Sequence, residues 1–319
     1  MDVCVLGRIG YDLYALEHGR PLAEVERFSR HLGGSSANIA VGLARLGHDV
    51  GIISSVGADA LAEYLLAFLK AEKVDTRFVR LVPGYNTSLC LTEVSPPDRF
   101  PQVFYRREPA DTRVEVGPPE LDAVRSARLF VTNGTSLAAS PSREATLAAL
   151  RTAREARART VLDVDYRASS WSSPEAAGAQ ARTALPFVDV VLGNEDEITL
   201  LTGEPDARRQ VAAVLDAGVG LLVRKLGARG VEAHTRDDST SVPPLPVRVV
   251  STIGAGDAFA SGFLDELHRG RPRAECLRAG NAAAAIVVGR VSCSDAMPYR
   301  NEIEELLRAA SGSGEREQP

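Results

Sequence analysis

The sequence lacks any arrangement of cysteine and histidine that is typical of a metal site or a disulfide framework. Its four cysteines are scattered, without a Cys-x-x-Cys pair, and its five histidines are not clustered. This distribution excludes a zinc finger or zinc ribbon. Two of the cysteines lie inside apolar segments, which predicts reduced thiols that pack in the interior of a cytosolic protein.

Long hydrophobic runs and an excess of basic residues are also missing. No apolar stretch is long enough to span a bilayer, and no basic segment precedes a signal-like core at residues 1–7, which read as a first strand. The net charge is −5, so the sequence has no excess of basic residues that would indicate binding to nucleic acid. We therefore expect a cytoplasmic protein that binds neither membranes nor nucleic acid.

Two common nucleotide-binding signatures are absent as well. No Gly-x-x-x-x-Gly-Lys-[Ser/Thr] occurs, which excludes a Walker-type phosphate loop. Phe259 occupies the position at which a dinucleotide fingerprint requires its third glycine. A Rossmann-type dehydrogenase is therefore the weakest of the functional alternatives, and titration with NADH would reveal one.

The sequence does contain a glycine-rich junction between an apolar strand and an apolar helix. Residues 251–263 read Ser-Thr-Ile-Gly-Ala-Gly-Asp-Ala-Phe-Ala-Ser-Gly-Phe. Gly254 and Gly256 let the backbone approach a ligand, and the first N–H groups of the helix favour an anion such as phosphate. Asp257 would repel that anion unless it accepts a proton from the group that attacks the phosphate. The alternative is a tight turn before a core helix, with Asp257 as a favourable charge at the helix start.

Short β-branched runs alternate with longer helical patterns along the chain. This alternation predicts an α/β fold with a mostly parallel sheet, helices on both faces, and ligands at the carboxyl ends of the strands. The predicted strands are Val3–Gly7, Val50–Val56, Leu129–Thr132, Thr160–Val164, Val188–Gly193 and Gly220–Lys225. The predicted helices include Ser36–Leu46, Leu61–Lys73, Ser142–Arg157 and Pro205–Ala217. The polar residues 311–319 are expected to be a disordered tail.

Two segments resemble signatures of the ribokinase-like (PfkB) carbohydrate kinases. One is the junction at 251–263, and the other is residues 33–47, a diglycine loop that runs into a helix containing Asn38. The resemblance implies a three-layer α/β/α sandwich over residues 1–310. It also implies that residues 8–32 and 86–110, which alone would indicate surface hairpins, form a small β-sheet lid over the sugar. Lids of this family often pair, so a homodimer through the lid is expected.

The same resemblance implies roles in phosphoryl transfer from ATP. Asp257 is the expected catalytic base, beside an anion hole formed by Gly254, Ala255 and Gly256. Asn194 and Glu197, in the run Asn-Glu-Asp-Glu after a predicted strand, would organise Mg²⁺ through water. The nucleotide contacts implied by the resemblance come from Asn194, Lys225, Gly227, Gly230, Gly254, Gly256 and Asn281. Taken alone, these segments read as a helix start, a β-turn and an alanine-rich core helix.

The acceptor is indicated by arginines. Arg106 and Arg167 suit an acceptor that carries a carboxylate, whereas a neutral hexose needs amides and carboxylates. A closer resemblance, over residues 1–308, is to the 5-dehydro-2-deoxygluconokinases of myo-inositol breakdown, and it rests on residues 7–14, 100–107, 163–167 and 293–298. It implies transfer to a primary hydroxyl, at C6, of 5-dehydro-2-deoxy-D-gluconate. Substrate contacts are expected from Asp12, Gly33, Gly34, Asn38, Tyr105, Arg106 and Arg167.

Two departures from the family pattern leave alternatives open. Many ribokinase-like enzymes have an aspartate of a monovalent-cation site where this chain has Ser251, so we do not expect activation by potassium. The lid ends in the acidic run 108–111, which leaves the acceptor open among 2-keto-3-deoxygluconate, fructose and nucleosides. A catalytically silent sugar-binding regulatory protein on the same fold is the alternative from another functional class, and ADP release with a sugar acid would exclude it.

Overall fold

The computed structural model describes residues 1–97 and 99–314. A nine-stranded sheet forms the centre of the molecule. Its strands are β1 (Val3–Leu6), β4 (Val50–Gly57), β5 (Val79–Val82), β8 (Leu129–Asn133), β9 (Arg159–Asp163), β10 (Val190–Asn194), β11 (Leu221–Lys225), β12 (Val231–His234) and β13 (Ser239–Val242). The order is β13-β12-β11-β10-β9-β8-β1-β4-β5. All pairs from β11 to β5 are parallel, and β12 and β13 add an antiparallel hairpin at one edge.

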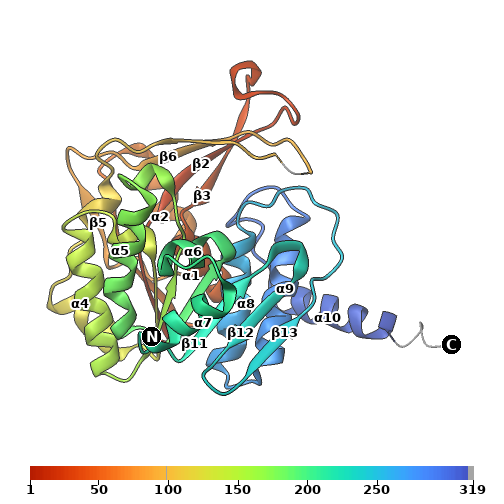
Figure 1. The fold of residues 1–319 in the computed structure, drawn as a ribbon. Coiled ribbons are helices and arrows are strands. Elements are labelled where there is room, and N and C mark those ends of the chain that lie inside the picture. The colour runs from red at the N-terminus through yellow and green to blue at the C-terminus, as the bar shows by residue number, and fades with distance from the viewer. Residues whose placement is uncertain (98, 315–319) are drawn as a thin grey trace.

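Helices cover both faces of this sheet (Figure 1). One layer contains α1 (Ser35–Arg45), α2 (Ala60–Ala71), α8 (Ala255–His268), α9 (Arg273–Val288) and α10 (Arg300–Gly314). The other contains α3 (Pro118–Ser126), α4 (Ser142–Glu155), α5 (Pro174–Ala184), α6 (Glu195–Thr202) and α7 (Ala207–Asp216). In β1, Val3 and Val5 pack toward the first layer and Cys4 and Leu6 toward the second. Burial on both faces explains why such strands read as continuous apolar runs.

A second sheet forms the lid. It consists of β2 (Gly10–Ala15), β3 (Phe28–Gly33), β6 (Ser88–Thr92) and β7 (Gln102–Tyr105), in the order β3-β2-β6-β7. Figure 1 shows these strands, in red and orange, projecting over the body of the molecule. Because β2 follows β1 and β3 leads directly into α1, the lid is joined to the most central elements of the body.

The predicted α/β fold with a mostly parallel sheet is confirmed. The antiparallel hairpin β12–β13 was not among the predicted strands. The disordered tail is expected from residue 311, whereas α10 continues to Gly314. The rest of that tail, 315–319, lies outside the described residues. No helix in the described part of the chain is long and apolar enough to cross a membrane.

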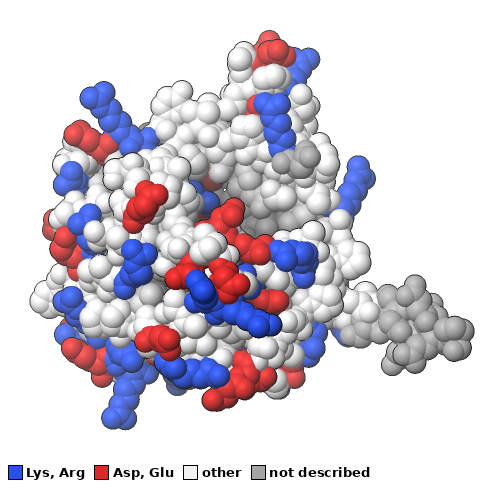
Figure 2. Space-filling view, viewed as in Figure 1, with Lys and Arg blue, Asp and Glu red and all other residues white. Residues whose placement is uncertain are grey.

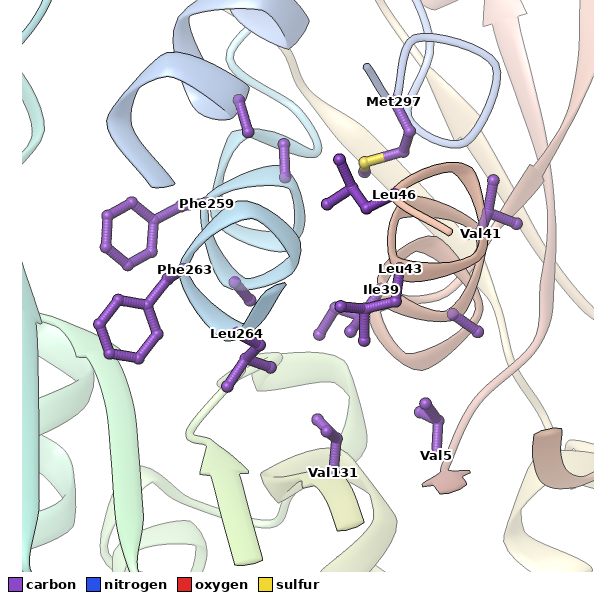
Figure 3. Packing of buried hydrophobic residues seen from close by; sticks show 14 of the residues in the cluster. Val5, Ile39, Val41, Leu43, Leu46, Val131, Phe259, Phe263, Leu264 and Met297 are labelled. Atoms are coloured by element: carbon purple, nitrogen blue, oxygen red, sulfur yellow. The ribbon is translucent and has the colours of Figure 1, made fainter. Parts of the chain in front are cut away.

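Helices α1 and α8 pack side by side on the central strands. Figure 3 shows Ile39 and Leu43 of α1 and Leu264 of α8 above Val5 and Val131, which belong to β1 and β8. All five side chains are buried. The central strands therefore hold both helices through one continuous apolar contact.

The two helices approach closely because Gly42 has no side chain where it meets Ser261. A Cβ at position 42 would lie 2.2 Å from Oγ and 2.6 Å from Cβ of Ser261. One helical turn earlier stand Asn38 on α1 and Asp257 on α8. Their side chains meet, and Nδ2 of Asn38 donates a hydrogen bond of 2.7 Å to Oδ2 of Asp257. Small residues in the middle of the helices thus set the distance between polar residues near their starts.

Replacement of Gly42 with Ala is expected to destabilise the protein by about 1–3 kcal/mol, because the added methyl group forces α1 away from α8. Urea denaturation measures this free energy of unfolding. Gly220→Ala is the matched control: its new Cβ would meet nothing nearer than the carbonyl oxygen of Asp189 at 3.5 Å, and a change within about 0.5 kcal/mol is expected. A Gly42→Ala protein as stable as the wild type would show that this contact does not hold the helices together.

Candidate active site

Polar residues end four neighbouring strands of the central sheet. They are Asn133 on β8, Asp163 on β9, Asn194 on β10 and Lys225 on β11. Because these strands are parallel, their carboxyl ends meet at one edge of the sheet, where open α/β sheets bind ligands. The lid starts at the same edge. Figure 2 shows a hollow between the lid and the body, with acidic side chains along its border.

The start of α8 forms an anion site at this edge. Gly254 is the N-cap residue in the left-handed conformation (φ 84°), and a Cβ there would lie 3.0 Å from Sγ of Cys293. The N–H of Ala255 bonds to the carbonyl of Thr252 at 3.3 Å. The N–H groups of Gly256 and Asp257 belong to the first turn and have no partner inside the helix. They can receive an anion, as the helix dipole also favours.

Asp257 combines features of a general base. Its carboxylate accepts the hydrogen bond from Asn38, and Oδ1 of Asn38 in turn accepts one of 2.6 Å from the hydroxyl of Ser294. Burial and the neighbouring charge of Asp165 raise the pKa of Asp257, while the hydrogen bond from Asn38 and the charge of Arg167 oppose the shift. A carboxylate with a raised pKa, held in one orientation beside an anion site, is suited to accept a proton.

Lys225 lies beneath the anion site. A Cβ on Gly256 would be 3.4 Å from its Nζ. The ammonium group also pairs with both carboxylate oxygens of Asp163, at 3.2 and 3.1 Å. Burial raises the pKa of Asp163, and the charge of Lys225 opposes that shift. Asp163 therefore holds Lys225 in place, and the lysine adds a positive charge next to the open N–H groups.

Asn194 and Glu197 form a capping box at the start of α6. Oδ1 of Asn194 accepts from the N–H of Glu197, and Oε2 of Glu197 accepts from the N–H of Asn194. Oε1 of Glu197 accepts from the N–H of Tyr166 at 3.1 Å. The described residues contain no cluster of three or more His, Cys, Asp or Glu that could hold a metal ion directly. Each oxygen of Glu197 keeps a second lone pair, which fits contact with a hydrated Mg²⁺ through water.

On the lid side, Asp12 points from β2 toward the body. It is 6% exposed, and no described residue donates a hydrogen bond to its carboxylate. A Cβ on Gly33 would lie 2.1 Å from its Oδ2, and one on Gly34 would lie 2.4 Å from the carbonyl oxygen of Arg8. The diglycine therefore lets the lid and α1 meet. Burial raises the pKa of Asp12 to about 6, against the charge of Arg8.

Both predicted arginines lie in this region and have carboxylate partners. Arg106 is buried, pairs with Asp111, and donates to Oγ of Ser88 and of Ser170. Arg167 is 39% exposed and pairs with Asp165 at 3.0 Å. The charges of Asp165 and then Asp257 raise its pKa, although burial opposes them. Arg167 thus lies close to Asp165 and Asp257, whereas Arg106 is bound at the base of the lid.

Tyr105 is not brought into the site. Strand pairing places Asp12 opposite Cys90, and Cys90 opposite Phe104, so these three side chains share the inner face of the lid. Tyr105 is the next residue along β7, points to the outer face, and is 62% exposed. The alternation of a strand, which a short motif does not reveal, decides which of the two aromatic residues faces the site.

Gly227, Gly230 and Asn281, which are also expected at the nucleotide, follow Lys225 in the chain. Gly227 and Gly230 bound the turn between β11 and β12 and have φ values of 58° and 92°. A Cβ on Gly230 would lie 2.2 Å from the carbonyl oxygen of Val242. Asn281 of α9 donates through Nδ2 to the carbonyl of Pro243, at 2.9 Å. The turn and α9 are therefore joined around residues 242–243.

Three residues of the site were missed in the sequence. Asp163 and Asp165 both occur in the Asp-x-Asp-Tyr-Arg run, but only Arg167 was selected from it. Asp165 is 4% exposed and has a φ of 36°, a conformation that is strained for a residue with a side chain. Arg8 is 6% exposed directly after β1. A charged residue at the end of an apolar central strand was the available signal.

Known proteins resemble this chain in sequence and in fold. The family model described as pfkB family carbohydrate kinase matches residues 1–300. A 5-dehydro-2-deoxygluconokinase of Clostridium beijerinckii is 35% identical over 315 residues, covering 97% of this chain and 93% of that protein. Among solved structures, a fructokinase of Xylella fastidiosa with bound ATP is 25% identical, covers 97% of this chain and 99% of its own, and has a TM-score of 0.86. A ribokinase II of Escherichia coli with ATP and Mg²⁺, 23% identical with the same coverage, has a TM-score of 0.87 and shows the fold alone.

Replacement of Asp12 with Asn is expected to stabilise the protein at neutral pH. The pKa of Asp12 is about 6 in the folded state and about 3.9 when unfolded, so the folded state loses stability as the pH rises between these values. The neutral variant avoids that loss. Its free energy of unfolding should exceed that of the wild type by about 2–3 kcal/mol at pH 7.5 and should equal it at about pH 4. Urea denaturation at both pH values measures the gain. Asp237→Asn, at an exposed position, serves as control. An Asp12→Asn protein that is no more stable than the wild type at pH 7.5 would contradict a raised pKa of Asp12.

Proposed function

Because this chain belongs to the pfkB family of carbohydrate kinases, we propose that it transfers the γ-phosphoryl group of ATP to a primary hydroxyl of a sugar acid. The best candidate acceptor is 5-dehydro-2-deoxy-D-gluconate, with C6 as the position of transfer. The observation that carries this proposal is the position of Asp257. Its carboxylate is held by Asn38 at the start of α8, next to the open N–H groups of an anion site.

Asp257 accepts the proton of the acceptor hydroxyl as that oxygen attacks the γ-phosphorus. The O–H bond breaks, a new O–P bond forms, and the bond from the γ-phosphorus to its bridging oxygen breaks, which releases ADP. The N–H groups of Gly256 and Asp257 and the ammonium of Lys225 stabilise negative charge on the transferring group. These donors are already in place before the substrates bind, so little reorganisation is needed during the reaction.

Mg²⁺ fits the acidic side of this site. When bound with ATP, it would offset charge on the β- and γ-phosphates. Glu197 would hold it through water, together with the carbonyl oxygen or side chain of Asn194, because magnesium retains several waters in such sites. Arg167 is close to Asp257 and Asp165, which supports a contact with the transferring phosphoryl group rather than with the far end of the acceptor.

The choice of a sugar acid is supported by charge and by similarity. Arg8, Arg106 and Arg167 lie around the lid and the ends of the strands. Arg106 and Arg167 are paired with carboxylates, which leaves Arg8 as an unpaired cation where a neutral sugar requires none. The curated relative from Clostridium beijerinckii is named for a sugar-acid acceptor. A fructokinase function has the support of the fold likeness to the Xylella fastidiosa protein.

An acceptor screen with ATP tests the substrate class. We expect 5-dehydro-2-deoxygluconate to give the highest kcat/KM, followed by 2-keto-3-deoxygluconate, with fructose and ribose lower by about 100-fold or more, because a desolvated charge pair contributes several kcal/mol. ADP release, coupled to a spectrophotometric readout, measures each rate. Fructose or ribose as the preferred acceptor would refute a sugar-acid kinase, and no ADP release with any acceptor would favour a silent binding protein.

Replacement of Asp257 with Asn is expected to lower kcat by about 10²–10⁴-fold, the usual contribution of a general base, with the KM for the acceptor changed little. In the wild type, kcat/KM should fall at acidic pH as Asp257 becomes protonated. Because its pKa is raised, the fall should begin above the ordinary aspartate range near about pH 3.9. Steady-state kinetics from about pH 4.5 to about pH 8.5 record both effects. Retention of more than about a tenth of kcat would refute the base assignment.

A further inference from the structure

Arg8 is a buried cation at the point where the chain passes from the body into the lid. It follows β1, precedes β2, and is 6% exposed. Its carbonyl oxygen packs against Gly34, and a Cβ on Gly10 would lie 3.2 Å from its Nη1. The guanidinium therefore extends along the beginning of β2. Its Cζ is 5.8 Å from the centre of the Phe104 ring, which belongs to the inner face of the lid.

The guanidinium of Arg8 lies over the ring of Phe104 but has no hydrogen-bond or carboxylate partner among the described residues. Its Nε is buried without a hydrogen-bond partner, and no described carboxylate lies within the 4.0 Å that defines an ion pair. Asp12 is a neighbour that influences Arg8 electrostatically but does not pair with it. Burial of an unpaired charge and of an unsatisfied donor is strongly unfavourable, and native proteins rarely retain either without a ligand or a functional reason.

The neighbouring arginines differ from Arg8 in this respect. Arg106 is neutralised by Asp111, and Arg167 pairs with Asp165. Both sequence-based candidates for the anionic end of the acceptor are thus already satisfied. Arg8 alone of the three has no carboxylate partner, so the two Nη groups of its guanidinium remain for an incoming anion, on the lid side of the site next to Phe104.

We propose that Arg8 binds the carboxylate of the sugar-acid acceptor and is the residue that selects an acidic over a neutral acceptor. This inference rests on the proposed function, since it assigns the acid group of that acceptor. The guanidinium forms two parallel hydrogen bonds with a carboxylate, a geometry that a lysine cannot reproduce. Asp257 at the start of α8 then receives the hydroxyl end, and Arg8 at the root of the lid receives the acid end.

The first experiment compares a sugar acid with its own methyl ester. The ester of 2-keto-3-deoxygluconate keeps every hydroxyl and loses the charge. The wild type should prefer the acid to the ester by about 100-fold or more in kcat/KM. Arg8→Met should reduce that preference to about threefold or less, through a lower kcat/KM for the acid, and Arg8→Lys should restore it only in part. The KM for ATP should stay unchanged if Arg8 binds the acceptor. A raised KM for ATP would indicate that Arg8 binds a phosphate of ATP, the other anion of the reaction.

Arg107→Met is the matched control, since this exposed arginine is also in the lid and carries the same charge. It should keep the wild-type preference. Three results would overturn the proposal: an Arg8→Met enzyme that retains the preference for the acid, one that loses acid and ester activity equally, or one whose main defect is a raised KM for ATP.

Binding without turnover gives a second, independent readout. Arg8→Met removes a buried unpaired charge, so the free variant should melt at the wild-type temperature or higher. Addition of 2-keto-3-deoxygluconate without ATP should raise the melting temperature of the wild type and of Arg107→Met, but not that of Arg8→Met. A free Arg8→Met protein that melts well below the wild type, or one that retains the ligand-induced shift, would contradict the proposal.

Failure of this inference can be distinguished from failure of the proposed function. If the wild type phosphorylates the acid and its ester equally well, a sugar kinase remains and the role of Arg8 is refuted. If the wild type phosphorylates only neutral sugars, the sugar-acid function is refuted. In that case, if 2-keto-3-deoxygluconate does not shift the melting temperature of the wild type, the role of Arg8 is refuted too. A shift that is lost in Arg8→Met would instead support a carboxylate site in a protein with another activity.

Discussion

The close contact of α1 with α8 is the constraint on which the site depends. Gly42 leaves room for Ser261, and this contact brings Asn38 and Asp257 together one turn earlier on each helix. Both helices rest on the apolar surface of the central strands, so the position of the Asp257 carboxylate is determined by packing in the core rather than by a loop. A side chain held in this way keeps its orientation whether or not a ligand is bound.

Around this contact the site holds charges that are only partly compensated. Burial raises the pKa values of Asp257, Asp12 and Asp163, while Lys225 and the arginines provide opposing charge. Such an arrangement disfavours the free protein, because buried charges are stabilised only by well-placed partners. In the proposed reaction, negatively charged substrates would supply the missing interactions for the cations among these residues.

In the lid, sequence patterns predicted the regions that contain the strands but not which side chains face the site. Residues 10–33 and 88–105 contain the four lid strands, in the regions that interrupt the α/β rhythm. The motif also identified a Tyr-Arg pair at 105–106, but Tyr105 faces outward and Arg106 is neutralised by Asp111. Strand register places Phe104 on the inner face instead. A shift of one residue reverses the face of a strand, so the motif alone could not determine which side chain meets the acceptor.

The sequence by itself determined the α/β fold, the anion site at Gly254–Asp257 and the diglycine start of α1, because these depend on local periodicity and on short-range backbone requirements. It also identified Asn194 and Lys225, two of the four polar residues that end strands β8 to β11. Only the tertiary structure decided which carboxylates and cations pair, which arginine stays unpaired, and how Asn38 reaches Asp257. These features depend on contacts between segments far apart in the chain, and such contacts are set by the packing of whole elements rather than by local sequence.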